Sequence, residues 1–149
     1  MRIVVIFTTL LALASLVMPA DSPATKPATV VKADAVMAGF DKGGSLVDGG
    51  AFLVQTSRRV KPGGPEAHMR QDEIMYVVSG SATLVTGGAI TGLREGKNGN
   101  VGGTGIDGGV EQKIGKGDVV VVPKGTPHWF KEVPEPINYY VVKVNRTTN

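Results

Sequence analysis

The sequence of 149 residues has no cysteine, only two histidines and one tryptophan, and 5% aromatic residues. The absence of cysteine excludes disulfides and thiol chemistry, so the stability of the fold must come from its apolar core. The charge is nearly balanced, with 16 Lys and Arg against 13 Asp and Glu. The one local basic cluster, residues 58–61, is interpreted as a solvated loop, and the sequence offers no basic stripe of the kind that binds nucleic acid.

A long apolar run occurs only at the start of the chain. Arg2 is followed by apolar residues from Ile3 to Val17 and by Ala20, a pattern typical of a signal peptide over residues 1–20. The run is shorter than the roughly 20 residues of a membrane-spanning helix. We expect cleavage near Ala20 and a secreted or periplasmic protein with no membrane attachment, and an uncleaved anchor is the alternative. Residues 21–28, rich in Pro and Ala, indicate a flexible linker before a domain over 29–149.

The domain is predicted to be all-β. Its apolar residues fall into short runs, rich in Val and Tyr and separated by glycine or proline, at 29–36, 51–56, 74–79, 81–86, 118–122 and 138–144. No window in it keeps a helical period for ten residues, and 21 Gly and 9 Pro disfavour long helices. The pleat places Glu73 on one face with Met75 and Val77. The segment Val119 to Val122 is apolar on both faces, which predicts a central, covered strand.

Residues 87–109 contain ten glycines and are predicted to form an insertion, either a long loop or an irregular hairpin. Such a segment is either a lid or binding element or an exposed insertion without a role. Residues 103–108 match G-x-G-x-x-G, but neither a preceding strand nor a following helix is expected there. Dinucleotide binding is therefore not predicted.

Two spaced motifs surround the two histidines. In the first, His68 is followed by Glu73 and Gly80, and in the second Gly117, Pro123, Gly125 and His128 are spaced as G-x5-P-x-G-x2-H. Together these motifs resemble those of the cupin superfamily, and the chain is similar to small exported single-domain cupins. The resemblance implies a jelly-roll barrel, a double-stranded β-helix, in a single domain.

The resemblance also implies a divalent metal ion, Fe, Mn, Zn or Ni, held by His68, Glu73 and His128. Glu66 takes the place of the first histidine of the cupin motif, and the asparagine usual after the second motif is Glu132. Two imidazoles and one carboxylate form a facial triad that suits such ions. Glu66 is either a fourth ligand or a surface residue that follows a Gly-Gly-Pro turn.

The physics of the same residues is compatible with two interpretations. A buried Glu73 needs a metal, a protonated histidine or a raised pKa, because an unpaired buried charge costs several kcal/mol. Pro123, Gly125 and Pro127 make a stiff corner that would aim His128. In a metal-free cupin, the same Glu73 and His128 would pair and only shape the pocket.

Three functions follow from these residues. The first is a metal-dependent enzyme that oxidises, decarboxylates or isomerises a small oxygenated molecule, for which Tyr76, Lys124 and Glu132 are the candidate acids and bases and no catalytic residue is assigned. The second is a non-catalytic extracytoplasmic module that binds a small molecule or a metal. The third is a purely structural protein. Open strand edges in such a fold also allow a homodimer through residues 29–36 or the C-terminal strand.

Overall fold

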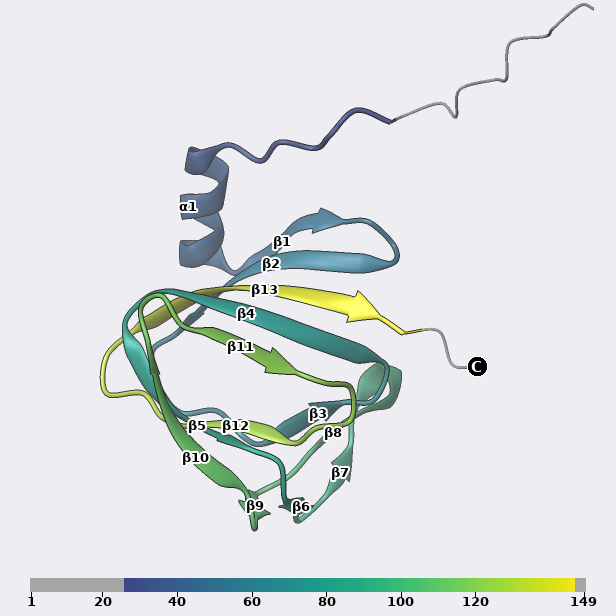
Figure 1. Ribbon diagram of the computed structural model, residues 1–149, viewed down its shortest axis with the longest axis vertical. Coiled ribbons are helices and arrows are strands. Elements are labelled where there is room, and N and C mark those ends of the chain that lie inside the picture. The colour runs from purple at the N-terminus through teal and green to yellow at the C-terminus, as the bar shows by residue number, and fades with distance from the viewer. Residues whose placement is uncertain (1–25, 147–149) are drawn as a thin grey trace, which may run out of the picture.

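The computed structural model describes residues 26–146 and consists mainly of antiparallel strands in two facing sheets (Figure 1). The signal peptide expected at residues 1–20, the cleavage at Ala20 and most of the linker lie outside the described residues. The predicted all-β class and the jelly-roll barrel are confirmed. No helix among residues 26–146 has the length and apolar character needed to cross a membrane.

The first sheet has five strands in the order β1-β2-β13-β4-β11. Their bounds are β1 Gly44–Asp48, β2 Phe52–Arg59, β4 Gln71–Ser79, β11 Val119–Val122 and β13 Ile137–Asn145. The middle strand β13 pairs with β2 on one side and with β4 on the other. Alternate residues of these strands therefore point into the barrel, as the buried positions Glu73, Met75 and Val77 of β4 show. The predicted common face of these three residues is confirmed.

The second sheet has six strands in the order β10-β5-β12-β3-β8-β7. Their bounds are β3 Glu66–His68, β5 Ser81–Thr86, β7 Arg94–Glu95, β8 Asn100–Gly102, β10 Val110–Gly115 and β12 His128–Glu132. The core lies between the two sheets and is apolar apart from the hydroxyl of Tyr139; it is formed by Met75, Val77, Ala82, Leu84, Ile114, Val122, Phe130, Ile137, Tyr139 and Val141.

The prediction of a strand at residues 29–36 is wrong. The structure has a helix there, α1 Ala33–Lys42, which lies over β1 and β2 (Figure 1). The segment is rich in alanine, with Asp34 in the first turn and Lys42 in the last, as the helix dipole favours. Only Phe40 is buried, edge-on against Tyr140 at 5.4 Å, so the apolar stripe is too narrow to show as a helical period.

The prediction that Val119–Val122 is a central, covered strand is also wrong. Strand β11 lies at the edge of the five-stranded sheet, and Val119 and Val121 are 61% and 63% exposed. Val120 and Val122 face the core. Helix α1 contacts β1 and β2, and no element among residues 26–146 lies over the outer face of β11. The apolar run therefore does not mean burial on both faces.

The glycine-rich insertion 87–109 forms an irregular hairpin, as one of the two alternatives predicts. Strands β6 Ala89–Thr91 and β9 Gly105–Asp107 pair with each other, and the 3-10 turn η1 Lys97–Gly99 precedes β8. Strand β8 pairs on both sides, with β3 and β7, so part of this segment joins the main sheet in spite of its glycines. The G-x-G-x-x-G match at residues 103–108 overlaps β9. The expectation that no strand precedes it is wrong, because β8 ends at Gly102, but within residues 26–146 no helix follows it.

Candidate metal centre

Strands β3 and β12 bring three of the four predicted ligands together. Glu66 and His68 are two residues apart on β3 and so share a face, and Glu66 is the direct partner of His128 across the pair with β12. His68 and His128 are buried, whereas the Glu66 side chain is 39% exposed. The Glu66 side chain is therefore part of the cluster and also open to solvent, and its role as a fourth ligand stays a prediction.

The corner before β12 fixes the ring of His128. Gly125 adopts a φ of 76°, which favours glycine, and its amide donates to the carbonyl oxygen of His68 at 2.9 Å. Nδ1 of His128 lies 3.1 Å from the carbonyl oxygen of Thr126. When Nδ1 carries the proton and donates it to this carbonyl, Nε2 keeps its lone pair and faces the barrel interior.

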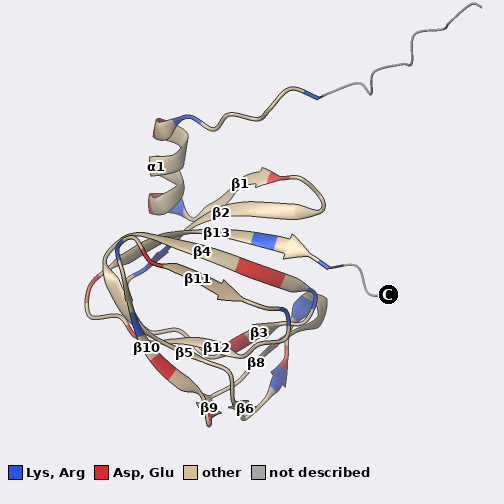
Figure 2. Cartoon of the chain, viewed as in Figure 1, with Lys and Arg blue, Asp and Glu red and all other residues tan. Residues whose placement is uncertain are grey.

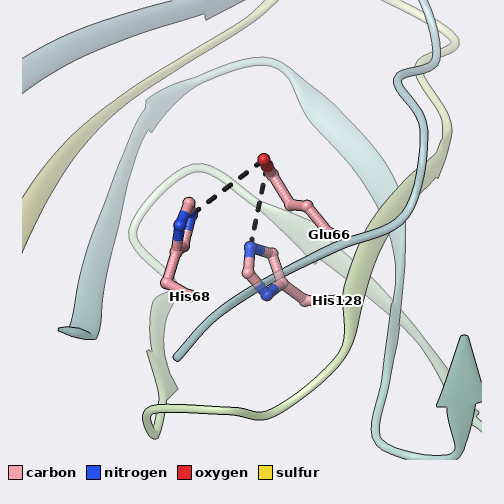
Figure 3. A group of neighbouring side chains, drawn as sticks. All are labelled: Glu66, His68 and His128. Atoms are coloured by element: carbon pink, nitrogen blue, oxygen red, sulfur yellow. Dashed lines mark ion pairs between the residues drawn. The ribbon is translucent and has the colours of Figure 1, made fainter. Parts of the chain in front are cut away.

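The ligand atoms of these three residues lie within 4.8 Å of one another. Figure 3 shows the Glu66 carboxylate directed toward both imidazoles. Its Oε2 lies 4.0 Å from Nε2 of His68, and its Oε1 lies 3.7 Å from Nε2 of His128. The two rings are 5.4 Å apart between centroids. The cluster therefore offers two imidazole nitrogens and a carboxylate oxygen to a common point.

Glu73 reaches the same cluster from the opposite sheet. Its Oε1 lies 3.1 Å from Nε2 of His68, and its Oε2 lies 3.2 Å from Nε2 of His128. The two histidines thus lie between two carboxylates, Glu66 on their own sheet and Glu73 across the barrel. All four predicted ligand residues meet in one place.

Lys143, which the sequence analysis did not single out, joins Glu73. Its Nζ lies 2.7 Å from Oε1 of Glu73 and 3.1 Å from Nε2 of His68. Lys143 and Glu73 are direct partners between β13 and β4, where an acidic and a basic segment lie side by side (Figure 2). The signal in the sequence is the alternation Tyr139, Val141, Lys143, which places a lysine on an otherwise inward-facing row.

The electrostatics of the cluster follow from these contacts. Burial raises the pKa of Glu73, but hydrogen bonds from His128, His68 and Lys143 outweigh it and hold this pKa well below its usual range. The hydrogen bond to Glu73 raises the pKa of His68, against the opposing effects of burial and of the Lys143 charge. Nδ1 of His68 has no hydrogen-bond partner among residues 26–146, although the Asn100 side chain is near enough to raise the same pKa slightly.

The donor set fits a divalent metal ion. Ligand atoms bound about 2.1 Å from one ion lie roughly 3.0 to 4.2 Å apart, and the distances from the histidine nitrogens to the Glu66 and Glu73 oxygens run from 3.1 to 4.0 Å. Imidazoles with carboxylates suit Fe, Mn, Zn and Ni alike. Lys143 pairs with one oxygen of Glu73, and the three residues whose ligand atoms group within 4.8 Å of one another are Glu66, His68 and His128.

A cavity of about 90 Å³ adjoins the cluster. It is lined by Gln55, Ser57, Arg59, Glu66, Glu73, Met75, His128, Phe130, Tyr139, Val141 and Lys143. The interpretation of residues 58–61 as a loop is wrong for Arg58 and Arg59, which are both in β2, and Arg59 points into this cavity. The physical reason is the pleat: Arg58 and Arg59 point to opposite faces of β2, and Arg58 alone is exposed.

The three candidate acids and bases lie outside the cavity. Tyr76 is 47% exposed on the outer face of β4. The backbone amide of Lys124 donates to Asp72, and Glu132 accepts a hydrogen bond from Thr83. None of the three residues lines the cavity beside Glu73, so their suggested roles are not supported.

The comparisons with known proteins agree with this architecture. A sequence model of the family described as Cupin matches residues 53–149, and the chain belongs to the cupin family. No curated protein matches the sequence.

Three solved structures illustrate the likeness in fold. The chain is similar to BH2720 from Bacillus halodurans, with a TM-score of 0.57 and 16% identity over 85% of this chain and 87% of that one. A cupin-2 domain containing protein from Shewanella frigidimarina has a TM-score of 0.52 and 13% identity over 78% and 95% of the two chains. The Cnp3 cupin domain of Schizosaccharomyces pombe has a TM-score of 0.50 and 12% identity over 69% and 59%.

Proposed function

We propose that this cupin binds one divalent metal ion between Glu66, His68 and His128, with Glu73 beside them, and that a small oxygen-bearing molecule binds next to the ion. The observation that carries the proposal is the convergence of two imidazole nitrogens with carboxylate oxygens inside the barrel. The cavity that adjoins the cluster is where the small molecule would bind. A cavity with a few convergent polar groups among apolar ones is the usual form of a small-molecule site.

Each residue of the cluster has its own role in the proposed site. His68 and His128 supply neutral nitrogen ligands, and Glu66 supplies an oxygen whose orientation is held by Arg59 at 3.4 Å. Lys143 balances the charge of Glu73. A divalent ion in this set supplies Lewis acidity that polarises a bound oxygen, which serves oxidation, decarboxylation and isomerisation alike.

Metal analysis tests the proposal. The purified protein is stripped with a chelator, loaded in turn with Mn, Fe, Zn and Ni, and titrated calorimetrically. We expect one ion per chain in the wild type and a loss of affinity of roughly a hundredfold or more in His128→Ala, His68→Ala and Glu66→Gln, since even the loss of an outer-shell partner costs about tenfold to a hundredfold.

Glu95→Gln is the matched control for Glu66→Gln, because Glu95 is an exposed carboxylate on β7. It should leave the affinity unchanged. A wild-type protein that takes up no ion, or a His128→Ala variant that binds as tightly as the wild type, would contradict the proposal.

A non-catalytic binding module is the second candidate function. It is favoured by the pairing of both carboxylates, Glu66 with Arg59 and Glu73 with Lys143, which leaves neither one free as a general base. The metal-loaded protein then binds a small molecule and returns it unchanged. Product analysis after incubation with pooled small carboxylates and alcohols separates this function from an enzyme: any new product supports the enzyme.

We propose in addition that the protein is exported. The support is the apolar run from Ile3 to Val17 after Arg2, with Ala20 behind it. Expression of the full chain in a bacterium, followed by N-terminal sequencing of the periplasmic fraction, tests it. A mature protein that begins near Asp21 supports export, and an intact protein that stays in the cytoplasm contradicts it.

A further inference from the structure

One wall of the cavity beside the metal centre is polar where a barrel interior is normally apolar. Gln55, Ser57 and Arg59 alternate along β2 and all line this cavity. Polar residues on an inward-facing row cost stability unless they are hydrogen-bonded, and such positions are commonly functional. Because none of the three residues is among the proposed metal ligands, they require an explanation of their own.

Arg59 is held in a defined position. Its Nε donates to Oη of Tyr139 at 3.0 Å, and its guanidinium lies 4.6 Å from the centre of the Phe130 ring. Gly63 leaves room for it, because a Cβ at that position would come within 2.6 Å of Nη1 of Arg59. The guanidinium is therefore oriented before any ligand arrives, which lowers the entropy lost on binding.

The guanidinium keeps hydrogen-bonding capacity. Of its five N–H donors, one is used by Tyr139 and one by Glu66 at the long distance of 3.4 Å. Among the residues that the structure describes, the Arg59 side chain makes no other hydrogen bond, and 28% of it is exposed. Donors arranged as a planar fork are suited to a carboxylate, which can accept two of them at once.

The charges around the cavity point the same way. Glu66 and Glu73 carry two negative charges, and Arg59 and Lys143 carry two positive charges that pair with them. A divalent ion bound by neutral histidines then adds two positive charges that no side chain of the cluster balances. Uncompensated charge in a poorly solvated site favours a ligand of opposite sign.

The cavity also limits the size of the ligand. Its volume of about 90 Å³ is far below the roughly 300 to 1,000 Å³ typical of pockets for drug-sized molecules. We infer that the molecule bound beside the metal is a small carboxylate, with one end at the metal centre and a second negatively charged group paired with the guanidinium of Arg59. This inference rests on the proposed metal site and assigns Arg59 as its specificity-determining residue.

Calorimetric titration of the metal-loaded protein with malonate tests the inference. Malonamide, the neutral analogue of the same shape, and acetate, with a single carboxylate, are titrated in parallel. We expect malonate to bind the wild type at least about tenfold more tightly than either of them. Arg59→Met should remove roughly tenfold to a hundredfold of the malonate affinity, the range expected for hydrogen bonds to a charged group, while one ion per chain is retained.

Three further variants sharpen the test. Arg58→Met is the matched control, because Arg58 is the neighbouring residue on the opposite face of β2 and is exposed; it should bind malonate as the wild type does. Arg59→Lys keeps the charge without the fork and should be intermediate. Gly63→Ala keeps every charge but displaces the guanidinium, so it should also weaken malonate binding. Circular dichroism and thermal melting establish that each variant is folded.

The two proposals fail in different ways. Metal content is measured before malonate is added, and a wild-type protein without metal refutes the proposed function and this inference with it. If the wild type and Arg59→Met each bind one ion per chain and bind malonate with equal affinity, the inference is overturned and the proposed metal site stands. Malonamide that binds as tightly as malonate has the same consequence. If Arg59 only positioned Glu66, Arg59→Met would weaken metal binding and leave malonate affinity at saturating metal unchanged, which also overturns it.

Discussion

The interior of the barrel has two adjacent parts whose burial affects the stability of the fold in opposite ways. One is the core cluster of Met75, Val77, Leu84, Phe130 and their neighbours, which is stabilised by burial of apolar surface. The other is the charged cluster of Glu66, His68, Glu73, His128 and Lys143. Its charged groups lose hydration free energy when they are enclosed in the barrel. The comparison separates the part that maintains the fold from the part in which we propose a metal site.

The largest expected effect on stability is in the apolar part. Leu84→Ala removes a side chain that is 1% exposed and leaves a cavity, and we expect a loss of about 2 to 5 kcal/mol in the free energy of unfolding. Urea denaturation followed by circular dichroism measures it. Leu93→Ala is the control, because Leu93 is 60% exposed and should change this free energy by less than about 0.5 kcal/mol. Equal losses in both variants would contradict the division.

Breaking one buried ion pair should cost less. Glu73→Gln leaves the Lys143 ammonium without its carboxylate, and a loss near 3 to 5 kcal/mol is typical of a fully buried pair. Because 18% of the Lys143 side chain is exposed, we expect about 2 kcal/mol in metal-free protein. The double variant Glu73→Gln with Lys143→Met should recover most of this stability. Losses that simply add in the double variant would show that the two side chains do not interact.

Lys143→Met alone should strengthen metal binding. The Lys143 ammonium lies against both Oε1 of Glu73 and Nε2 of His68, so its positive charge opposes a cation bound at the same place. We expect a rise in affinity of roughly tenfold, equivalent to about 1.4 kcal/mol, measured by calorimetric titration with Zn. Lys124→Met serves as the control, since the described contact of Lys124 with Asp72 is made by its backbone. A weaker affinity in Lys143→Met would show that the lysine assists binding.

A smaller effect, which depends on pH, is expected at Asp72 near the start of β4. The hydrogen bond from the backbone amide of Lys124, with the side-chain contact from Arg146, lowers the pKa of Asp72 below its ordinary value of 3.8. A lowered pKa in the folded state stabilises the protein above the ordinary value, and this stabilisation is lost as the pH falls through the folded-state pKa. Asp72→Asn should therefore melt at a lower temperature than the wild type at pH 6, with the difference shrinking below pH 3.8. A difference independent of pH would contradict this origin.

The smallest expected effect distinguishes the inside of β11 from its outside. Val121→Thr, at a position 63% exposed, should change the unfolding free energy by at most about 0.5 kcal/mol. Val122→Thr makes the same chemical change at a position 3% exposed, where a buried hydroxyl should cost about 1 to 3 kcal/mol. Thermal melting of the two variants gives the contrast, and a larger loss at Val121 would mean that this face is covered in solution.

The sequence predicted the fold class and the positions that meet in the site because both depend on short-range patterns. The resemblance to the cupin motifs singled out His68, Glu73 and His128, which lie on three different strands and meet inside the barrel. Arg59 and Lys143 were missed because each was judged by its own type and by its neighbours in sequence. Had the alternation of β2 and β13 been followed to their ends, both would have been placed on the inward row.

Two errors have a common physical origin in packing between elements. The run Val119–Val122 looked like a strand covered on both faces, but which strand lies at an edge is decided by pairing across the sheet, and β11 has β4 as its neighbour. Residues 33–42 fold as a helix whose one buried side chain, Phe40, packs on Tyr140, far along the chain. Local propensity does not contain such long-range contacts.

The ammonium of Lys143 acts as a counter-ion that the chain carries within itself. Because it lies against Glu73, the carboxylate is neutralised in the absence of any added ion. We therefore expect the polypeptide to fold before it binds an ion, in contrast to small zinc domains, which fold only around their metal. Chelation should then empty the site without unfolding the barrel, and occupancy would report the supply of ions in the surroundings.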